Sequence, residues 1–134
     1  MPENFDKDKL INYWLESSDK DFKTMLDLFA TKNYSWSLFI GHLVIEKLLK
    51  ALYINKTNEF PPMIHDLRRI AEKAGIILAE EPRINLDAIT RFNINARYDN
   101  YKNDFYTLCT VEFASNWIEI IKNTRSWIKE ELSK

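Results

Sequence analysis

The sequence predicts an all-α protein, an up-and-down helical bundle with three main helices plus one or two short ones. Three observations lead to this fold class. Apolar residues recur at three- and four-residue steps in long segments, which is the period of one helical face. Only two glycines and four prolines interrupt the chain, too few for the many turns of an all-β fold. Hydrophobic residues make up 46% of the sequence, enough for the core of one domain over residues 1–134.

Two long helices are predicted in the N-terminal half. The first covers about residues 7–31, with Asp6 as its N-cap, because a carboxylate there accepts hydrogen bonds from free backbone N–H groups. The second covers about residues 35–55. It carries more apolar residues than a surface helix needs, so we expect it at the centre of the bundle.

Shorter helices are predicted after the two consecutive prolines that follow the second helix. A third helix covers about residues 65–74, with Gly75 as its C-terminal stop. A turn or two covers residues 86–92, and the last helix covers about residues 107–132. Between these two, the segment NINARYDNYKND (residues 93–104) is predicted to be a polar connection.

Composition restricts the class of protein. The formal net charge of −1 gives no bulk basic field to attract nucleic acid or anionic membranes. The single cysteine, Cys109, cannot form an internal disulfide and is expected to be packed rather than catalytic. The N-terminus, MPENFDKDK, does not resemble a signal peptide, and no apolar run approaches a membrane span. We therefore expect a cytoplasmic protein without membrane association.

No cofactor is predicted, because two glycines cannot supply a phosphate-binding glycine loop or a dinucleotide fingerprint. His42 and Glu46 stand one helical turn apart, as metal ligands can, but further ligands are not evident and no metal is predicted. The alternative is that Glu46 pairs with Lys50 or with an arginine from another segment. His65 lies beside Asp66 at the start of the third helix, which indicates a capping role or an interaction with the helix dipole.

The four-residue spacing of His42, Glu46 and Lys50 predicts that they lie along one line of the second helix. We expect this line to lie near Arg97 or His65.

Several motifs along the chain match a known pattern. The second helix reads FIGHLVIEKLLKALYINK, PPMIHDL follows about ten residues later, and ARY opens the polar connection. The first helix has a tryptophan near its start and ends in DLFATKNYSWS. In this order and spacing the motifs resemble the HEPN domain, a small helical module of prokaryotes that also occurs in some large eukaryotic chaperone-like proteins. The resemblance spans about residues 14–127.

The resemblance implies a bundle that dimerises, usually with the segment before the last helix near the dimer cleft. Many members are ribonucleases, often toxins whose partner is a minimal nucleotidyltransferase. Those nucleases carry an arginine and then, after four to six intervening residues, a histidine. Arg97 matches the arginine, but residues 102–104 are Lys-Asn-Asp, so the histidine is absent.

Without this histidine the sequence favours a non-catalytic or weakly active protein that binds a nucleotide, RNA or a nucleotidyltransferase. Histidine suits metal-free RNA cleavage because it exchanges protons near neutral pH. One alternative is a ribonuclease toxin with a rearranged site around Arg97, Tyr101 and Lys102, if the protein is an enzyme at all. Another is a structural dimer or adaptor without a small ligand.

Ligand binding is predicted around Arg97, whose planar guanidinium suits phosphate, with Tyr98 and Tyr101 as faces for a base or a partner side chain. The candidate ligand-binding residues are Arg97, Tyr98, Tyr101, Lys102, Glu46, Lys50, His42 and His65. The alternative is that Arg97 pairs with Glu46 or Asp99 while the tyrosines pack on the bundle.

A homodimer or larger homo-oligomer is predicted, because four tryptophans are hard to bury in one small core. The candidate interfaces are the last helix, with Trp117 and Trp127, and residues 92–106.

Overall fold

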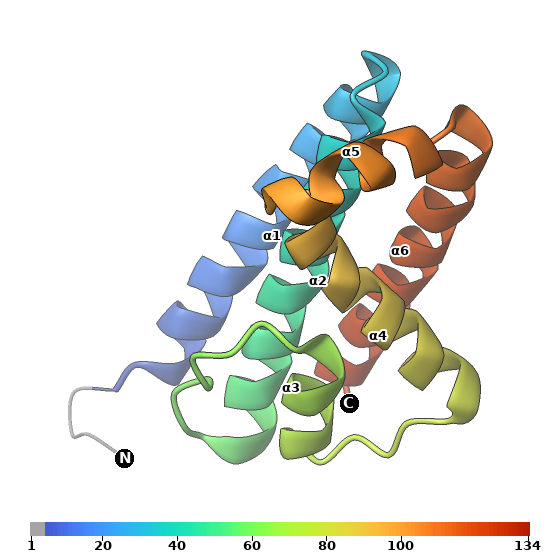
Figure 1. Cartoon of the computed structure of the whole chain (residues 1–134). Helices are drawn as coiled ribbons and strands as arrows, with labels where there is room; N and C mark the ends of the chain where they lie inside the picture. The colour runs from blue at the N-terminus through green and yellow to red at the C-terminus, as the bar shows by residue number, and fades with distance from the viewer. Residues whose placement is uncertain (1–4) are drawn as a thin grey trace.

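The computed structural model describes residues 5–134, except for the side chains of residues 99 and 100. Over that range it contains six helices and no strand. The main helices run up, down, up and down in the order α1, α2, α4 and α6 (Figure 1). The helices are α1 (Lys7–Ala30), α2 (Tyr34–Thr57), α3 (Leu67–Lys73), α4 (Glu80–Asn95), α5 (Asp99–Leu108) and α6 (Val111–Leu132). The predicted all-α bundle is confirmed, but it has four main helices rather than three, together with the two short helices α3 and α5.

The α2 helix lies at the centre of the bundle, as predicted. All five other helices contact it, and α1 packs along it most extensively. More than half of its 24 residues are buried, whereas α1 buries few of its side chains completely. The core therefore forms around α2, and polar residues on α2 lie deep in the protein.

The predicted start of α1 and the predicted stop of α3 are confirmed. Asp6 caps α1, because its Oδ1 accepts a hydrogen bond of 3.0 Å from the backbone N–H of Lys9. Gly75 follows α3 with a φ of 87°, a left-handed conformation that glycine adopts without steric penalty. The next N–H, of Ile76, then donates to the carbonyl of Ala71 at 3.1 Å.

The segment predicted for α4 is shorter than the helix. Residues 86–92 are only the middle of a helix that begins at Glu80 and ends at Asn95. Pro82 lies in the first turn, where a missing N–H removes no helical hydrogen bond. Glu80 and Glu81 add negative charge at the positive end of the helix dipole.

The predicted polar connection is wrong, because residues 93–104 are mostly helical. Only residues 96–98 separate α4 from α5, and α5 crosses α2 (Figure 1). Phe105 anchors α5, since it is buried with its ring 5.5 Å from that of Phe92. Cys109, just after α5, is also buried, and burial raises the pKa of its thiol to about 12. The expectation of a packed, unreactive cysteine is confirmed.

The last helix begins later than predicted. Thr107 belongs to α5, and α6 starts at Val111 because Thr110 caps it. The hydroxyl oxygen of Thr110 accepts a hydrogen bond of 3.2 Å from the N–H of Phe113.

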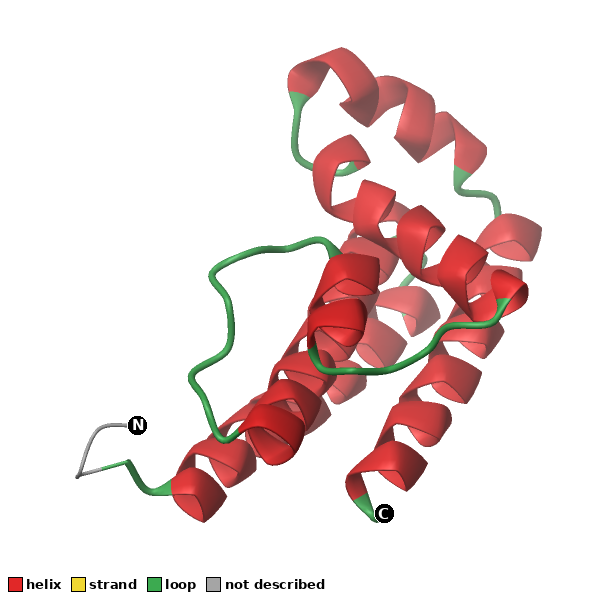
Figure 2. Cartoon of the chain, turned by 90° about the horizontal axis from the view of Figure 1, so that it is seen from below, coloured by secondary structure: helices red, strands yellow, loops and turns green. Residues whose placement is uncertain are grey.

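Two longer loops join the central helices, and Figure 2 shows them in green. The loop of residues 58–66 leads from α2 to α3 and carries His65 back to α2. No helix in residues 5–134 is long and apolar enough to cross a membrane.

Candidate functional site

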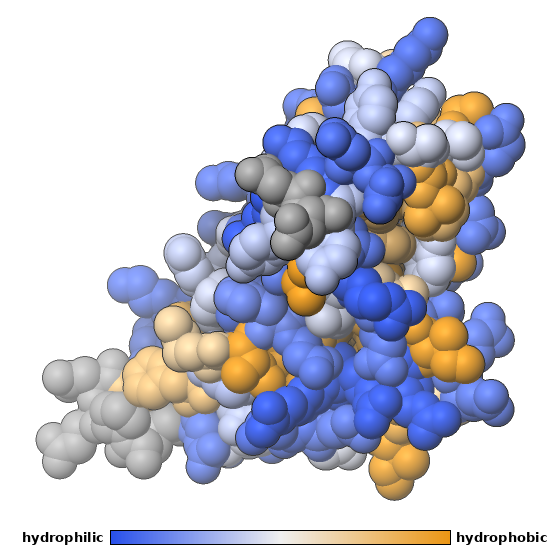
Figure 3. Space-filling model, in the orientation of Figure 1, coloured by the Kyte–Doolittle hydropathy of each residue, from blue (hydrophilic) through white to orange (hydrophobic). Residues whose placement is uncertain are grey.

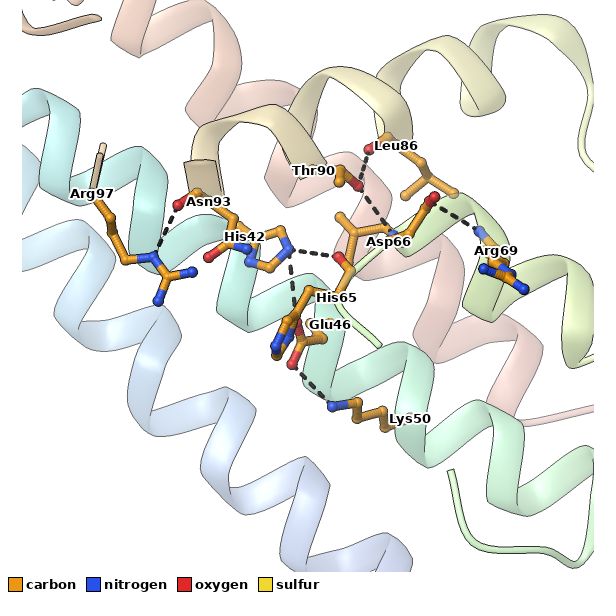
Figure 4. Close-up of polar contacts among 11 residues, drawn as sticks. His42, Glu46, Lys50, His65, Asp66, Arg69, Leu86, Thr90, Asn93 and Arg97 are labelled. Atoms are coloured by element: carbon orange, nitrogen blue, oxygen red, sulfur yellow. Dashed lines mark hydrogen bonds and ion pairs between the residues drawn. The ribbon is translucent and has the colours of Figure 1, made fainter. Parts of the chain in front are cut away.

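Three polar residues of α2 lie in the interior at successive turns of the helix. His42, Glu46 and Lys50 are all buried, and the exposed fraction is 6% or less for each. The predicted line of residues is confirmed, and Figure 4 shows it together with His65 and Arg97. Burying charged groups is unfavourable unless they are paired, so their partners define the site.

Glu46 is the centre of this group, and its two carboxylate oxygens have different partners. Nδ1 of His65 donates to Oε1 at 2.8 Å, and Nζ of Lys50 donates to Oε2 at 3.1 Å. Nε2 of His42 lies 3.7 Å from Oε1, too far for a hydrogen bond. The expectation that this line lies near His65 is met, and the alternative pairing of Glu46 with Lys50 is also present.

His65 does not cap α3, so that expectation is wrong. Asp66 is the cap, since its Oδ1 accepts from the N–H of Arg69 at 3.3 Å. The ring of His65 instead turns towards Glu46, while 63% of its side-chain surface remains exposed. A buried carboxylate thus holds a solvent-accessible imidazole.

His42 connects the loop of residues 58–66 to α2. Its Nε2 lies 3.0 Å from the carbonyl oxygen of His65, to which it donates a hydrogen bond. Burial is the main cause that lowers the pKa of His42, and the charges of His65 and Arg97 lower it further, while the His65 carbonyl and Glu46 raise it. His42 is therefore neutral near pH 7, with its proton on Nε2. Its buried Nδ1 has no hydrogen-bond partner among the described residues.

Arg97 lies on the other side of the His42 ring, in the connection between α4 and α5 (Figure 4). Its Nε donates to the carbonyl of Asn93 at 3.0 Å. Among the described residues it makes no ion pair with Glu46, so that part of the alternative is wrong. The alternative also allowed a pair between Arg97 and Asp99, but the side chain of Asp99 lies outside the described residues.

Aromatic rings surround the cations that precede and begin α5. The guanidinium of Arg97 lies 5.5 Å from the ring centroid of Phe39 and 5.8 Å from that of Tyr98. Nζ of Lys102 lies 5.5 Å from the ring of Trp36. We call these five residues the cation–aromatic face. Arg97, Tyr98, Lys102 and Trp36 are exposed, so the face is accessible from solvent.

The structure thus separates the predicted site residues into two groups. The first comprises Lys50, Glu46, His65 and His42, and the second is the cation–aromatic face. Tyr101 is exposed but belongs to neither group, since it lines a shallow hollow with Asn95, Asp104, Phe105 and Leu108.

Sequence reasoning missed Trp36 and Phe39, which begin α2 and meet edge to face at 5.7 Å. Their three-residue spacing, one turn before His42, was the available signal.

Comparison with known proteins agrees with the helical arrangement. A family model described as the HEPN domain matches residues 11–132. The chain belongs to the HEPN domain family. Searches of curated proteins and of solved structures found no match. Membership indicates a ribonuclease or nucleotide-related function, and HEPN domains often dimerise.

No histidine follows Arg97 in this chain, whose two histidines are His42 and His65. The positions where the histidine is expected, 102–104, fall on α5 and are Lys-Asn-Asp. Lys102 at the first of them lies over Trp36. Among the side chains that the structure describes, no set of three or more His, Cys, Asp or Glu is arranged to hold a metal ion.

Proposed function

We propose that this HEPN protein binds single-stranded RNA through the cation–aromatic face of Arg97, Lys102, Trp36, Phe39 and Tyr98. The observation that carries the proposal is the alternation of two cations with three aromatic rings on one accessible surface. Proteins that bind single strands combine cations for the phosphates with aromatic faces on which bases stack.

Arg97 is the main phosphate-binding residue in this proposal. The hydrogen bond from Nε to Asn93 fixes the orientation of the guanidinium, and among the described residues its two terminal nitrogens remain to donate to a phosphate. Trp36 provides a base-stacking surface, because 39% of it is exposed at the start of α2. The neutral state of His42 leaves the positive charge of Arg97 without a second cation behind it.

The proposal is tested by anisotropy of a fluorescent single-stranded RNA with wild type, Arg97→Ala and Arg69→Ala. Arg69 is a matched control, since it is exposed on α3, away from the face. We expect Arg97→Ala to weaken binding at least about tenfold and Arg69→Ala to change it less than about twofold. The affinity of the wild type should also fall steeply as salt rises.

Two results would contradict the proposal: a wild type that does not bind RNA, or an Arg97→Ala variant that binds as tightly as the wild type. Circular dichroism of both variants checks that the helices are retained. Loss of helix in Arg97→Ala alone would favour the alternative that Arg97 serves packing.

A second candidate function is self-association. Leu108 and Val111 are exposed to 54% and 44%, and Tyr106 to 73%, where α5 is followed by α6. Figure 3 shows hydrophobic surface at this corner, at the upper right. Large exposed apolar patches usually mark interfaces.

The tryptophans first assigned to an interface lie elsewhere. Trp117 and Trp127 of α6 are half-buried and pack against the core, and the ring of Trp117 lies 5.2 Å from that of Phe92. We therefore propose residues 106–111 as the interface of a homodimer.

A further inference from the structure

A cleft lies between the first half of α4 and the second half of α6, and it has a volume of about 240 Å³. Both helices pack on α2, and Figure 1 shows them crossing one another. Their direct contact is slight, so the side chains of the two helices form the walls of an open cleft. We propose that this cleft binds an extended, lysine-rich segment of another protein.

Each wall of the cleft carries a side-chain amide, from Asn85 on α4 and from Asn123 on α6. The amide of Asn55 binds the carbonyl of Leu132, but neither Asn85 nor Asn123 makes such a bond among the described residues. An amide side chain both donates and accepts hydrogen bonds. A peptide unit presents the complementary pair, one C=O and one N–H. The two amides therefore match the backbone of a chain that runs between the helices.

The charge in and beside the cleft is negative. Glu81 lines the cleft, and Glu119 lies one helical turn before Asn123 on α6. Within the described part of the chain, neither carboxylate makes an ion pair. Arg83 and Lys122 are neighbours of these residues in the sequence, but they do not line the cleft. The cleft therefore attracts ammonium groups and repels phosphates.

Apolar side chains complete the cleft and suit the methylene stem of lysine. Leu86 is fully buried, and Ile120 and Trp127 are half-buried. Trp127 lies one turn after Asn123, so the indole adjoins the amide along the wall. A lysine stem covers apolar surface while its ammonium stays at the polar rim, and an indole face attracts the ammonium. The hydroxyl of Thr124 donates to the carbonyl of Ile120 at 2.8 Å, which leaves its oxygen as a further acceptor.

These groups favour an extended segment over a helical one. In an extended chain alternate side chains point to the same face, so lysine at every second position directs all ammonium groups towards the cleft. A helical segment satisfies its own backbone groups and has no N–H or C=O to offer the two amides. Asn85 and Asn123 thus recognise the backbone, and Glu81 recognises the charge.

The inference does not depend on RNA binding, because the cleft and the cation–aromatic face lie at different ends of α4. Glu81 is in the first turn of α4, whereas Arg97 follows its last turn. A helix of 16 residues is about 24 Å long. A peptide in the cleft therefore leaves Arg97 accessible.

The test is the anisotropy of a short fluorescent peptide of alternating lysine and alanine, measured with the full chain and without RNA. Asn85→Leu and Asn123→Leu keep the approximate size of the side chain, remove its hydrogen bonds and favour the helix. Asn12→Leu is the matched control, since Asn12 is exposed on α1 and outside the cleft. We expect each cleft variant to weaken binding at least about fivefold and Asn12→Leu to change it less than about twofold.

A second measurement tests the role of charge. The wild type should bind the lysine peptide at least about fivefold more tightly than a peptide of alternating glutamine and alanine. Glu81→Gln keeps the shape of the side chain but removes its charge, so it should lose most of this preference. The amide of N-acetyl-lysine has the ammonium but no extended backbone, and at the concentration of the peptide it should not compete.

Three results would overturn the inference. The first is a wild type that does not bind the lysine peptide, and the second is unchanged affinity in both cleft variants. The third is competition by the N-acetyl-lysine amide as strong as that by unlabelled peptide, which would indicate a site for small amines. Circular dichroism checks that the helices are retained, and if Asn85→Leu fails to fold, Asn123→Leu still gives the test. Arg97→Ala should bind the peptide like the wild type, so a failure of the proposed RNA binding is distinguished from a failure here.

Discussion

Gly41 of α2 and Ile121 of α6 are so close that a Cβ atom on Gly41 would lie 2.6 Å from Cδ1 of Ile121. The same atom would lie 3.1 Å from the sulfur of Met25 on α1. Both neighbours are fully buried and cannot move into solvent. The missing side chain therefore sets the distance at which α1 and α6 pack on the central helix.

Replacing this glycine by a branched residue should destabilise the protein. We expect Gly41→Val to lower the free energy of unfolding by about 1–3 kcal/mol, because extra methyl groups in a packed core displace their neighbours. Urea unfolding followed by circular dichroism measures the change. Gly41→Ala should cost less, since the higher helix propensity of alanine, worth about 1 kcal/mol, offsets part of the overlap. Equal stability of Gly41→Val and the wild type would show that the helices adjust freely.

Acid should destabilise the protein through His42. The pKa of His42 is lowered in the folded state from its ordinary value of 6.5, mainly by burial. Below 6.5 the unfolded chain therefore binds a proton at this residue that the folded chain does not take up. The folded state loses stability as the pH falls below 6.5, by up to about 1.4 kcal/mol per pH unit until the folded state also protonates. Above 6.5 this contribution is constant.

The His42→Gln variant isolates this effect. Its amide nitrogen occupies the place of Nε2 and donates to the carbonyl of His65, but it does not titrate. Unfolding in urea at pH 5.5 and 7.5 should show a smaller loss at low pH for the variant than for the wild type. Glu46, His65 and Arg97 act on residue 42 in both proteins, so the comparison isolates the effect of the His42 ring. The same loss in both proteins would exclude His42 as its source.

A charge at the corner between α5 and α6 should prevent self-association. The wild type is expected to be a dimer at micromolar concentration, and Leu108→Asp a monomer, as measured by light scattering after gel filtration. The substitution removes apolar surface from the interface and places a charge there. Because the side chain of Leu108 is 54% exposed, the melting temperature of the separated chain should change little.

The control for this change is Ile77→Asp. Ile77 is 98% exposed in the loop before α4, away from the corner. The Ile77→Asp substitution should leave the dimer unchanged. Dissociation by both substitutions would show that the interface is not confined to this corner. A wild type that stays monomeric at high concentration would rule out the proposed dimer.

The helices that were predicted well have two features in their sequence. Apolar residues recur at the helical period, and a capping or stop residue marks where the helix begins or ends. α1 has its apolar stripe and Asp6, and α3 has Gly75 after its last turn. The sequence does not predict α5 because its anchors, Phe105 and Cys109, lie after the polar segment of residues 93–104. Its stability depends on packing against α2 and α4, and local propensity does not report such contacts.

The candidate site was predictable where it follows one helix. The spacing of His42, Glu46 and Lys50 placed them together, since four residues make about one turn. The contact of His65 with Glu46 depends on the path of a loop, which the spacing of residues in the sequence does not predict. Trp36 and Phe39 became relevant only because α5 crosses the start of α2 and brings Arg97 and Lys102 over them.

The central position of α2 also has a consequence for the order of folding. α1 and α2 are joined by residues 31–33 alone, so their extensive contact forms with little loss of chain entropy. α6 reaches α2 only after the whole chain between Thr57 and Val111 has closed into a loop. We therefore expect the α1–α2 hairpin to form first, and the docking of α6 to be the slower, entropically opposed step that completes the domain.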